Sequence, residues 1–135
     1  MANGGNVPDP EMDEKSDPAW PFAIELFGKI AAIWQLSIAE QSAILGISDA
    51  AYLDLRDVRH DTHVSGEVLR RISYIVRVYR ALNILLSSQE AADTWIRRPN
   101  DADLFCGASA LAFILDGSED SLVALHDYLH ARLWS

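Results

Sequence analysis

The stretch Ser65–Leu86 most constrains the fold of this 135-residue chain. Its apolar residues recur at steps of four and three, which places them along one stripe of an α-helix. Three further residues, Leu69, Val76 and Leu85, widen the stripe, so the helix is expected to be buried on more than one side. The stripe itself consists of Val68, Ile72, Ile75, Tyr79, Leu82 and Leu86.

Polar residues complete the prediction for this helix. Ser65 is a favourable N-cap, and Glu67 lies in the first turn, where the helix dipole stabilises an anion. Four arginines, at positions 70, 71, 77 and 80, fall off the main stripe. We interpret the stretch as a central helix that joins two small helical units. An ordinary core helix of a single bundle is the alternative.

The distribution of charge limits the partners that the chain can attract. The formal net charge is −9, with −4 in residues 1–18, −2 in 19–60, +2 in 61–86 and −5 in 87–135. An acidic chain binds nucleic acid poorly without a local basic patch, because phosphate contacts need cations. The acidic C-terminal half suits a cationic protein partner, although acidity by itself commonly reflects solubility.

The sequence indicates a reducing compartment. Cys106 is the single cysteine, so no disulfide can form within the chain. No basic N-terminal region is followed by an apolar run, so we predict no signal peptide. No apolar segment reaches about 18 residues, so we predict no membrane span. The expected location is the cytoplasm.

The remaining segments predict an all-α fold, since none shows the alternation typical of a strand. Residues 1–19 form an acidic tail rich in Gly and Pro that is expected to be disordered. Residues 20–64 form a unit resembling a helix-turn-helix, 65–86 the central helix and 87–135 a small C-terminal helical unit. Apart from the central helix, the helices are predicted at 22–34, 37–45, 48–57, 89–97 and 110–115, and from Ser118 to the C-terminus, with Leu122, Leu125, Leu129 and Leu133 as the inner stripe of the last.

Residues 37–57 carry the pattern of a helix-turn-helix. Ser37 and Glu40 have the spacing of a capping box, Gly46 is suited to end the first helix, and Ser48 to cap the second. Two short helices joined by a tight glycine turn are typical of that motif. A generic helical hairpin within a bundle is the alternative.

Residue patterns associated with catalysis are weak. The seven glycines are scattered and form no phosphate-binding loop. His126 and His130 have an i,i+4 spacing compatible with a metal, but the sequence offers no signature for further ligands. The loop that carries Asp57, Arg59, His60, Asp61 and His63 has no nucleophile or cofactor motif beside it. We therefore predict a protein that is not an enzyme and holds no cofactor or metal.

The four tryptophans separate into two kinds. Trp20, Trp34 and Trp95 fall where a helical core needs large side chains. Trp134 is the second-last residue, past the end of the last predicted helix, where chains usually fray. An indole at that position is either folded back or docked on a partner, because both arrangements hide it from water. The residues leave these two alternatives open.

The C-terminal half resembles a known family. The run Glu90–Asn100, with Trp95 and Pro99-Asn100, is followed by Leu104–Leu111, which contains Gly107. This arrangement resembles the toxin-binding domain of MbcA/ParS/Xre antitoxins. Upstream, residues 69–75 and 79–82 are similar to the long helix of that family, so the resemblance covers about residues 20–135. Ala110 departs from the pattern, since proline is common there, but alanine still favours a helix.

The resemblance implies an antitoxin of a type II toxin–antitoxin system. Its partner would be a RES-domain toxin that attacks NAD, neutralised by a C-terminal segment placed at the entrance of the toxin active site. In this chain the segment is Arg132, Leu133, Trp134 and Ser135. The resemblance also implies a homodimer, and binding of the antitoxin's own promoter by the toxin–antitoxin complex.

The DNA-binding half is less well supported by the residues. Tyr52, Arg56 and Arg59 are the candidate DNA contacts on or just after the second helix of the motif. The same helix carries three aspartates, which would repel a phosphate backbone. We therefore expect DNA binding to be weak, or to require a dimer or the toxin complex. A stand-alone helix-turn-helix regulator whose C-terminal half dimerises is the alternative function.

Overall fold

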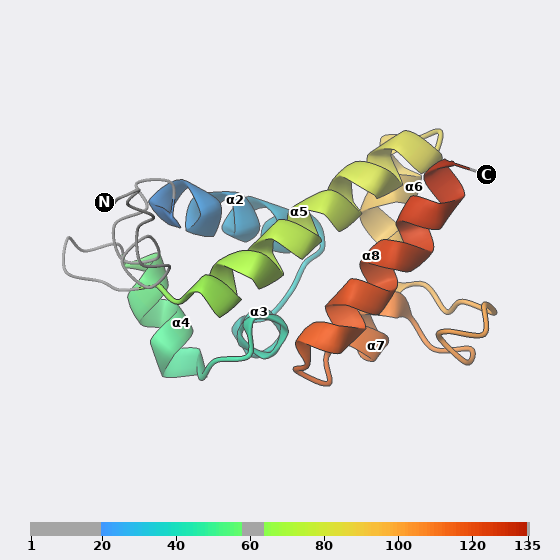
Figure 1. Cartoon of the computed structure of the whole chain (residues 1–135). Helices are drawn as coiled ribbons and strands as arrows, with labels where there is room; N and C mark the ends of the chain where they lie inside the picture. The colour runs from blue at the N-terminus through green and yellow to red at the C-terminus, as the bar shows by residue number, and fades with distance from the viewer. Residues whose placement is uncertain (1–19, 58–63, 135) are drawn as a thin grey trace, which may run out of the picture.

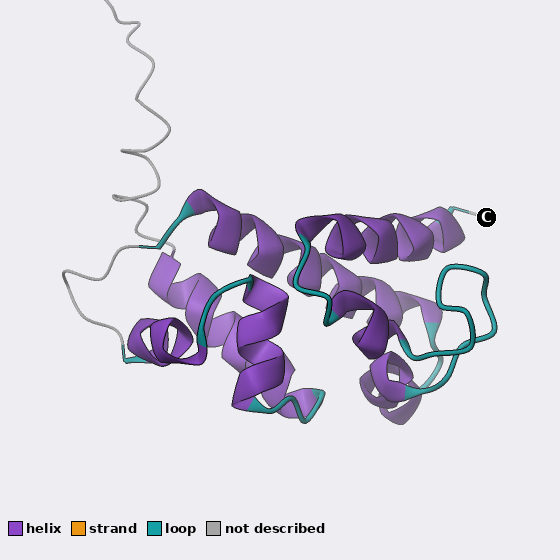
Figure 2. Ribbon diagram, turned by 90° about the horizontal axis from the view of Figure 1, so that it is seen from below, coloured by secondary structure: helices purple, strands orange, loops and turns teal. Residues whose placement is uncertain are grey.

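The chain folds into short helices around one long helix. The computed structural model describes residues 20–57 and 64–134, and Figure 1 shows the order of the elements. Within these ranges the only β-type pairing is an isolated bridge between Pro99 and Ser109. The predicted all-α class is confirmed, because every named element of the described residues is a helix (Figure 2). The elements are α2 (Trp20–Ile33), α3 (Ile38–Leu45), α4 (Asp49–Arg56), α5 (Gly66–Leu85), α6 (Gln89–Thr94), the 3₁₀ turn η1 (Trp95–Arg97), α7 (Ala110–Ile114) and α8 (Glu119–Leu133).

Serine side chains fix where six of the helices begin. Each accepts a hydrogen bond from a backbone N–H in the first turn, which satisfies a donor that the helix itself leaves unpaired. At Ser37 the reciprocal bond from Glu40 is also present, so the predicted capping box is confirmed. The six caps are Ser37, Ser48, Ser65, Ser88, Ser109 and Ser118.

Helix α5 is the longest described helix and packs against α2 and α8 (Figure 1). Its predicted stripe is confirmed, because Val68, Ile72, Ile75 and Leu82 are buried and Tyr79 and Leu86 are half-buried. Val78 and Ala81, which lie outside the predicted stripe, are also buried. Buried side chains from α2 through α8 form one contiguous core.

Arg71 lies off the predicted apolar stripe of α5 and is nevertheless buried. Its side chain is only 6% exposed. One terminal nitrogen, Nη1, donates to the carbonyls of Ile44 and Gly117, at 3.2 and 2.8 Å, and Nη2 donates to Glu67 at 2.7 Å. Gly46 lies so close that a Cβ atom there would be 2.6 Å from Nη1. Arg71 therefore ties the end of α3 to the turn that precedes α8.

A second arginine also links segments that are distant in sequence. The helix predicted to run to Arg97 ends its α-helical part at Thr94, and the last turn tightens to 3₁₀ geometry. The Arg97 guanidinium donates to the carbonyls of Trp34 and Gln35, at 2.8 and 2.6 Å, and to Glu40 at 3.2 Å. These bonds fasten η1 to the turn between α2 and α3.

Several predictions lie outside the described residues, namely those on residues 1–19, 58–63 and 135. None of the helices in the described part is long and apolar enough to cross a membrane.

Candidate functional site

The loop that the resemblance singled out holds an aromatic cluster in place. Asn100 anchors this loop with three bonds: its side chain accepts from the Ala102 N–H at 2.9 Å, its carbonyl accepts from the Gly107 N–H, and its own N–H donates to the Ala108 carbonyl. Cys106 and Gly107 both have positive φ, at 51° and 85°, which reverses the chain. The reversal directs Phe105 into the core, where it is 3% exposed.

Phe105 is the centre of this cluster. Its ring packs edge-on against Trp95, Phe113 and Tyr128, with centroid distances of 6.0, 5.6 and 5.3 Å. Edge-to-face contacts of this kind add about 0.5–1.5 kcal/mol each beyond simple burial. The cluster therefore joins η1, the loop, α7 and α8 into one rigid unit. Sequence reasoning missed Phe105 and Tyr128, since neither lies on a predicted helical stripe.

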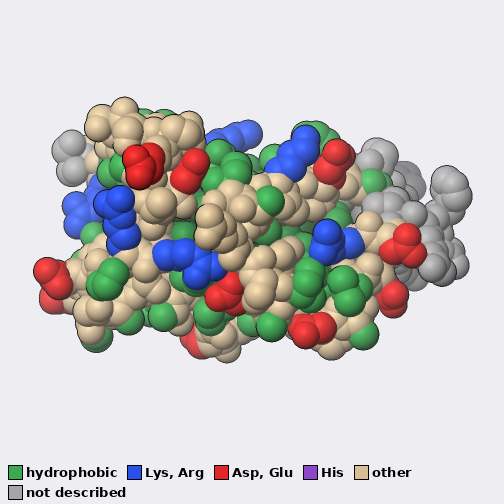
Figure 3. All heavy atoms as spheres, turned by 180° about the vertical axis from the view of Figure 1, so that it is seen from behind, with side chains coloured by type: hydrophobic (Ala, Val, Ile, Leu, Met, Phe, Trp, Pro, Cys, Tyr) green, Lys and Arg blue, Asp and Glu red, His purple; other side chains and the backbone are tan. Residues whose placement is uncertain are grey.

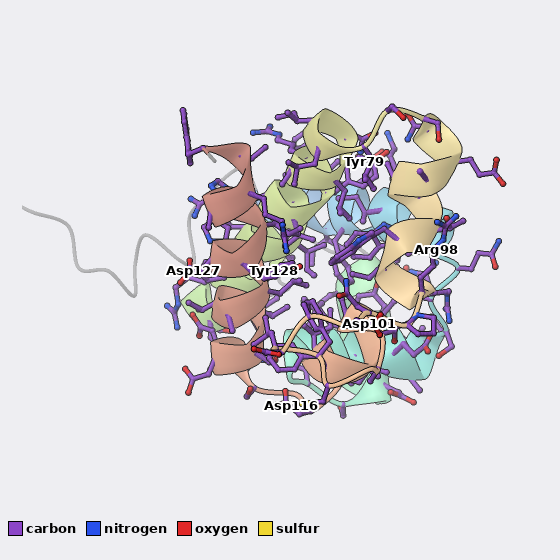
Figure 4. All side chains as sticks on the ribbon, turned by 90° about the vertical axis from the view of Figure 1, so that its right-hand side faces the viewer. Tyr79, Arg98, Asp101, Asp116, Asp127 and Tyr128 are labelled. Atoms are coloured by element: carbon purple, nitrogen blue, oxygen red, sulfur yellow. The ribbon has the colours of Figure 1, made fainter. Side chains whose placement is uncertain are left out.

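Helix α8 presents opposite sides to the core and to solvent. Leu122, Leu125 and Leu129 are buried, as the predicted stripe requires, and Leu133 is half-buried. In Figure 4, Tyr128 points from α8 towards the other helices and Asp127 points away from them. Near the start of α8, Glu119 accepts from Arg70 of α5 at 3.1 Å. The helix is thus fixed along its length against α5.

Three of the four residues predicted to bind the toxin lie together at the end of α8. The Arg132 guanidinium lies over the Tyr128 ring, 4.5 Å from its centroid, and donates to the Tyr128 hydroxyl at 2.6 Å. Leu133 packs towards the core, and the Trp134 N–H caps the helix on the carbonyls of Ala131 and Arg132. The fourth residue, Ser135, lies outside the described residues.

Trp134 is the most exposed of the large apolar side chains in the described part. It is 86% accessible to solvent, so its ring is not folded back on its own chain. By contrast Trp34 is buried, and Trp95 is half-buried in the aromatic cluster. Ile84, 71% exposed near the end of α5, is a second large apolar side chain facing solvent. Sequence reasoning did not single out Ile84, although it lies off the buried stripe.

An apolar pocket opens beside this end of α8. Its walls come from the last turns of α5, from η1 and from α8, with Arg132 as the charged member. The arginine is held by Tyr128 and so gives the pocket a fixed cationic edge. The lining residues are Leu82, Leu85, Leu86, Trp95, Tyr128, Leu129 and Arg132.

The three residues predicted to contact DNA do not share one exposed surface in the described part of the chain. Tyr52 is completely buried, packs edge-on against Phe27 at 5.9 Å and donates its hydroxyl to Gln41. Burial also raises the pKa of this hydroxyl, although Arg56 partly opposes the shift. The prediction that Tyr52 contacts DNA is therefore wrong, because Tyr52 belongs to the core. Arg56 is exposed, 5.9 Å from the Tyr52 ring centroid, and Arg59 lies outside the described residues.

The outer surface of α4 is acidic. Asp49, Asp54 and Asp57 are all exposed at or near this helix, and Leu53 beside them is 47% exposed. Figure 3 shows cations and carboxylates interspersed on the face seen from behind, with no continuous basic area on it. In Figure 1, α4 and the C-terminus lie at opposite ends of the molecule, so the two candidate binding regions are separate.

The two histidines of α8 lie against each other and against α5. The rings of His126 and His130 stack with centroids 4.0 Å apart, and His126 also packs edge-on to Tyr74 at 5.3 Å. Desolvation, the neighbouring His126 and then Arg77 lower the pKa of His130, and Asp127 opposes them. Among the described residues, no group of three or more metal-ligating side chains is placed to hold an ion.

Comparison with known proteins gives one informative match. No model of a known protein family matches the chain. A protein of Sinorhizobium fredii (strain NBRC 101917 / NGR234), called uncharacterized protein y4oB, is 36% identical over 112 residues. The aligned part covers 83% of this chain and 84% of that protein, so the likeness extends over most of both chains.

Proposed function

The chain belongs to the family of the Sinorhizobium fredii protein y4oB, and we propose that it is the antitoxin of a type II toxin–antitoxin system. The proposed partner is a RES-domain toxin that degrades NAD, as the resemblance to MbcA/ParS/Xre antitoxins implies. The observation that carries the proposal is Trp134, a large apolar side chain 86% exposed at the tip of a firmly packed helix.

An exposed indole at a fixed position is suited to anchor a partner. A tryptophan side chain offers about 200 Å² of contact surface, and buried tryptophans are among the strongest interface anchors, at about 2–4 kcal/mol each. Helix α8 is held by its three buried leucines and by the Arg70–Glu119 pair. The backbone at the tip is therefore held in place before binding, which lowers the entropy that is lost when a partner is bound.

The proposed action is steric. The segment Arg132–Ser135 enters the mouth of the toxin's NAD site, and Trp134 fills an apolar part of that cleft. The acidic C-terminal half, with a net charge of −5 over residues 87–135, complements a toxin site that accepts the anionic NAD. No chemistry by the antitoxin is required, because occupation of the entrance is enough to exclude NAD.

Co-expression of this chain with a RES-domain protein from the same organism tests this proposal. Intact antitoxin should preserve cellular NAD, whereas the chain lacking Arg132–Ser135 should not. Trp134→Ala should weaken toxin binding at least about 30-fold, the equivalent of about 2 kcal/mol. Phe22→Ala is the matched control, because Phe22 is also exposed, at 65%, but lies on α2. If the shortened chain still neutralises the toxin, the proposal that Arg132–Ser135 blocks the toxin site is refuted.

We also propose that α3, the Gly46 turn and α4 form a helix-turn-helix that binds promoter DNA only in the toxin complex, the antitoxin being a homodimer. The exposed aspartates around α4 support weak DNA binding by the free chain, because they repel phosphates. A gel-shift on the promoter of the gene that encodes this chain should show binding by the complex and little by the antitoxin alone. Tight binding by the free protein would instead favour a stand-alone transcription regulator.

A further inference from the structure

We propose that the groove between α2 and α5 is the docking surface for the acidic N-terminal segment of the same chain, residues 7–17. This proposal does not depend on the antitoxin function. The groove has an apolar floor, and Phe22, which is 65% exposed, lies at its edge. Its lining comes from the first turns of α2 and from one flank of α5, namely Phe22, Ala23, Leu26, Leu69, Ile72, Ser73, Val76, Arg77 and Arg80.

Two cations on this groove have no acidic partner in the part of the chain that the structure describes. Arg77 and Arg80 are exposed, and neither pairs with a carboxylate within residues 20–57 and 64–134. Arg77 lies 5.8 Å from the Tyr74 ring centroid, a contact that leaves its charge unneutralised. By contrast, three other arginines within the described residues each form an ion pair with a glutamate: Arg70, Arg71 and Arg97. In a chain of net charge −9, two unneutralised arginines beside an apolar floor favour a segment that is both acidic and apolar.

Residues 7–17 have that composition. They contain five carboxylates against one lysine, with Val7 and Met12 as apolar members and Glu11 and Asp13 on either side of Met12. Methionine fits irregular apolar surfaces well because its side chain is flexible. Pro8 and Pro10 favour an extended backbone. An extended segment can place Met12 on the groove floor while its carboxylates reach Arg77 and Arg80.

The connection and the length of the segment permit this docking. The segment ends three residues before α2, whose first turn forms one wall of the groove. Along α5, Leu69 to Arg80 spans about 17 Å, whereas eleven extended residues reach about 36 Å. The segment can therefore turn back and follow the groove. Because it is tethered there, its effective concentration is in the millimolar range, so a weak contact is sufficient.

Paramagnetic relaxation in the full-length chain tests the proposal. Cys106, the one native cysteine, is exchanged for serine, and a nitroxide is attached through Met12→Cys. Methyl resonances of Leu26, Leu69 and Val76 should lose more than half their intensity. Those of Leu104 and Leu111, in the C-terminal half, should stay sharp. The selective broadening should weaken at about 1 M salt, where the Debye length falls to about 3 Å.

Charge variants and mixing experiments separate the possible occupants. The double variant Arg77→Glu, Arg80→Glu should abolish the broadening. Arg98→Glu, which reverses an exposed cation in the C-terminal half, should retain it. Broadening that is uniform, absent, or confined to the side of α2 that faces Arg56 overturns the proposal. So does broadening that appears only when spin-labelled chains are mixed with isotope-labelled ones, because the occupant is then a second copy.

Discussion

Near the N-terminal end of α5 the Arg71 guanidinium is buried among backbone carbonyls of other segments, whereas near its C-terminal end Ile84 and, on α8, Trp134 face solvent. The contrast is clear at two glycines that both have positive φ, Gly46 at 72° and Gly107 at 85°. A Cβ atom on Gly46 would overlap the Arg71 guanidinium, whereas nothing lies within 4 Å of one on Gly107. The turn at Gly46 is therefore closely packed, whereas the turn at Gly107 is open.

The difference indicates that the two ends serve different purposes. The Arg71 guanidinium is buried and that of Arg97 is exposed, and each donates to backbone carbonyls of distant segments, which stabilises the fold. At the other end the core stops at Leu129 and Leu133, and Ile84 and Trp134 extend beyond it. Ile84 and Trp134 gain little from burial in the isolated chain, and the proposed function therefore uses Trp134 as the anchor for a partner.

The largest expected effect comes from comparing a buried tryptophan, Trp34, with the exposed Trp134. Trp34→Ala should lower the free energy of unfolding by about 3–5 kcal/mol, because it removes a fully buried side chain that packs near Tyr79. Trp134→Ala should change it by less than about 0.5 kcal/mol, since the ring is exposed. Urea denaturation measures both. A substantial loss of stability with Trp134→Ala would mean that the tip belongs to the fold.

The next largest effect on stability is expected for the substitution Arg71→Met. It should destabilise the chain by about 3 kcal/mol, because the carbonyls of Ile44 and Gly117 lose their donor in a buried site and Glu67 loses its ion pair. Arg80→Met, an exposed arginine on the same helix, is the control and should cost less than about 0.5 kcal/mol. Thermal unfolding of both variants makes the comparison. Equal midpoints would show that the Arg71 contacts contribute no net stability.

Most of the helical framework could be predicted from sequence because its signals are local. The six serine caps, the glycine that ends α3 and the stripe of α5 each depend on residues a few positions apart. Arg71 shows where this reasoning stops. Its partners Ile44 and Gly117 lie 27 and 46 residues away, so nothing in its own neighbourhood reveals that it is buried.

The candidate site was predictable in part. The position of Trp134 at the end of the last helix marked it for attention, and the structure decides that it is exposed. Tyr52 was misassigned because a tyrosine on a short helix reads equally well as a contact or as core. Its partners Phe27 and Gln41 come from two other helices. Phe105 was missed because its burial results from the chain reversal in the Asn100–Gly107 loop.

Two glycine substitutions sharpen the comparison further. Gly107→Ala should cost about 1 kcal/mol, the usual penalty for a side chain in the left-handed region. Gly46→Ala should cost about 2 kcal/mol or more, because it adds the overlap with Arg71 to the same penalty. In the background of Arg71→Met the excess at Gly46 should shrink, which a double-mutant cycle measures. If the excess persists there, the crowding does not come from the guanidinium.

The smallest effect concerns acid sensitivity where α5 and α8 meet. The pKa of His130 is lowered from its ordinary value near 6.5, first by desolvation and then by His126 and Arg77, with Asp127 opposing. As the pH falls below about 6.5, the unfolded chain takes up the proton first, so stability falls until the pH passes below the folded-state pKa. His130→Gln should therefore reduce the loss of stability between pH 7.5 and 5.5, measured by urea denaturation. If the variant loses as much stability between pH 7.5 and 5.5 as the original chain, His130 is not desolvated against α5. This side of α8 would then be as open to solvent as its tip.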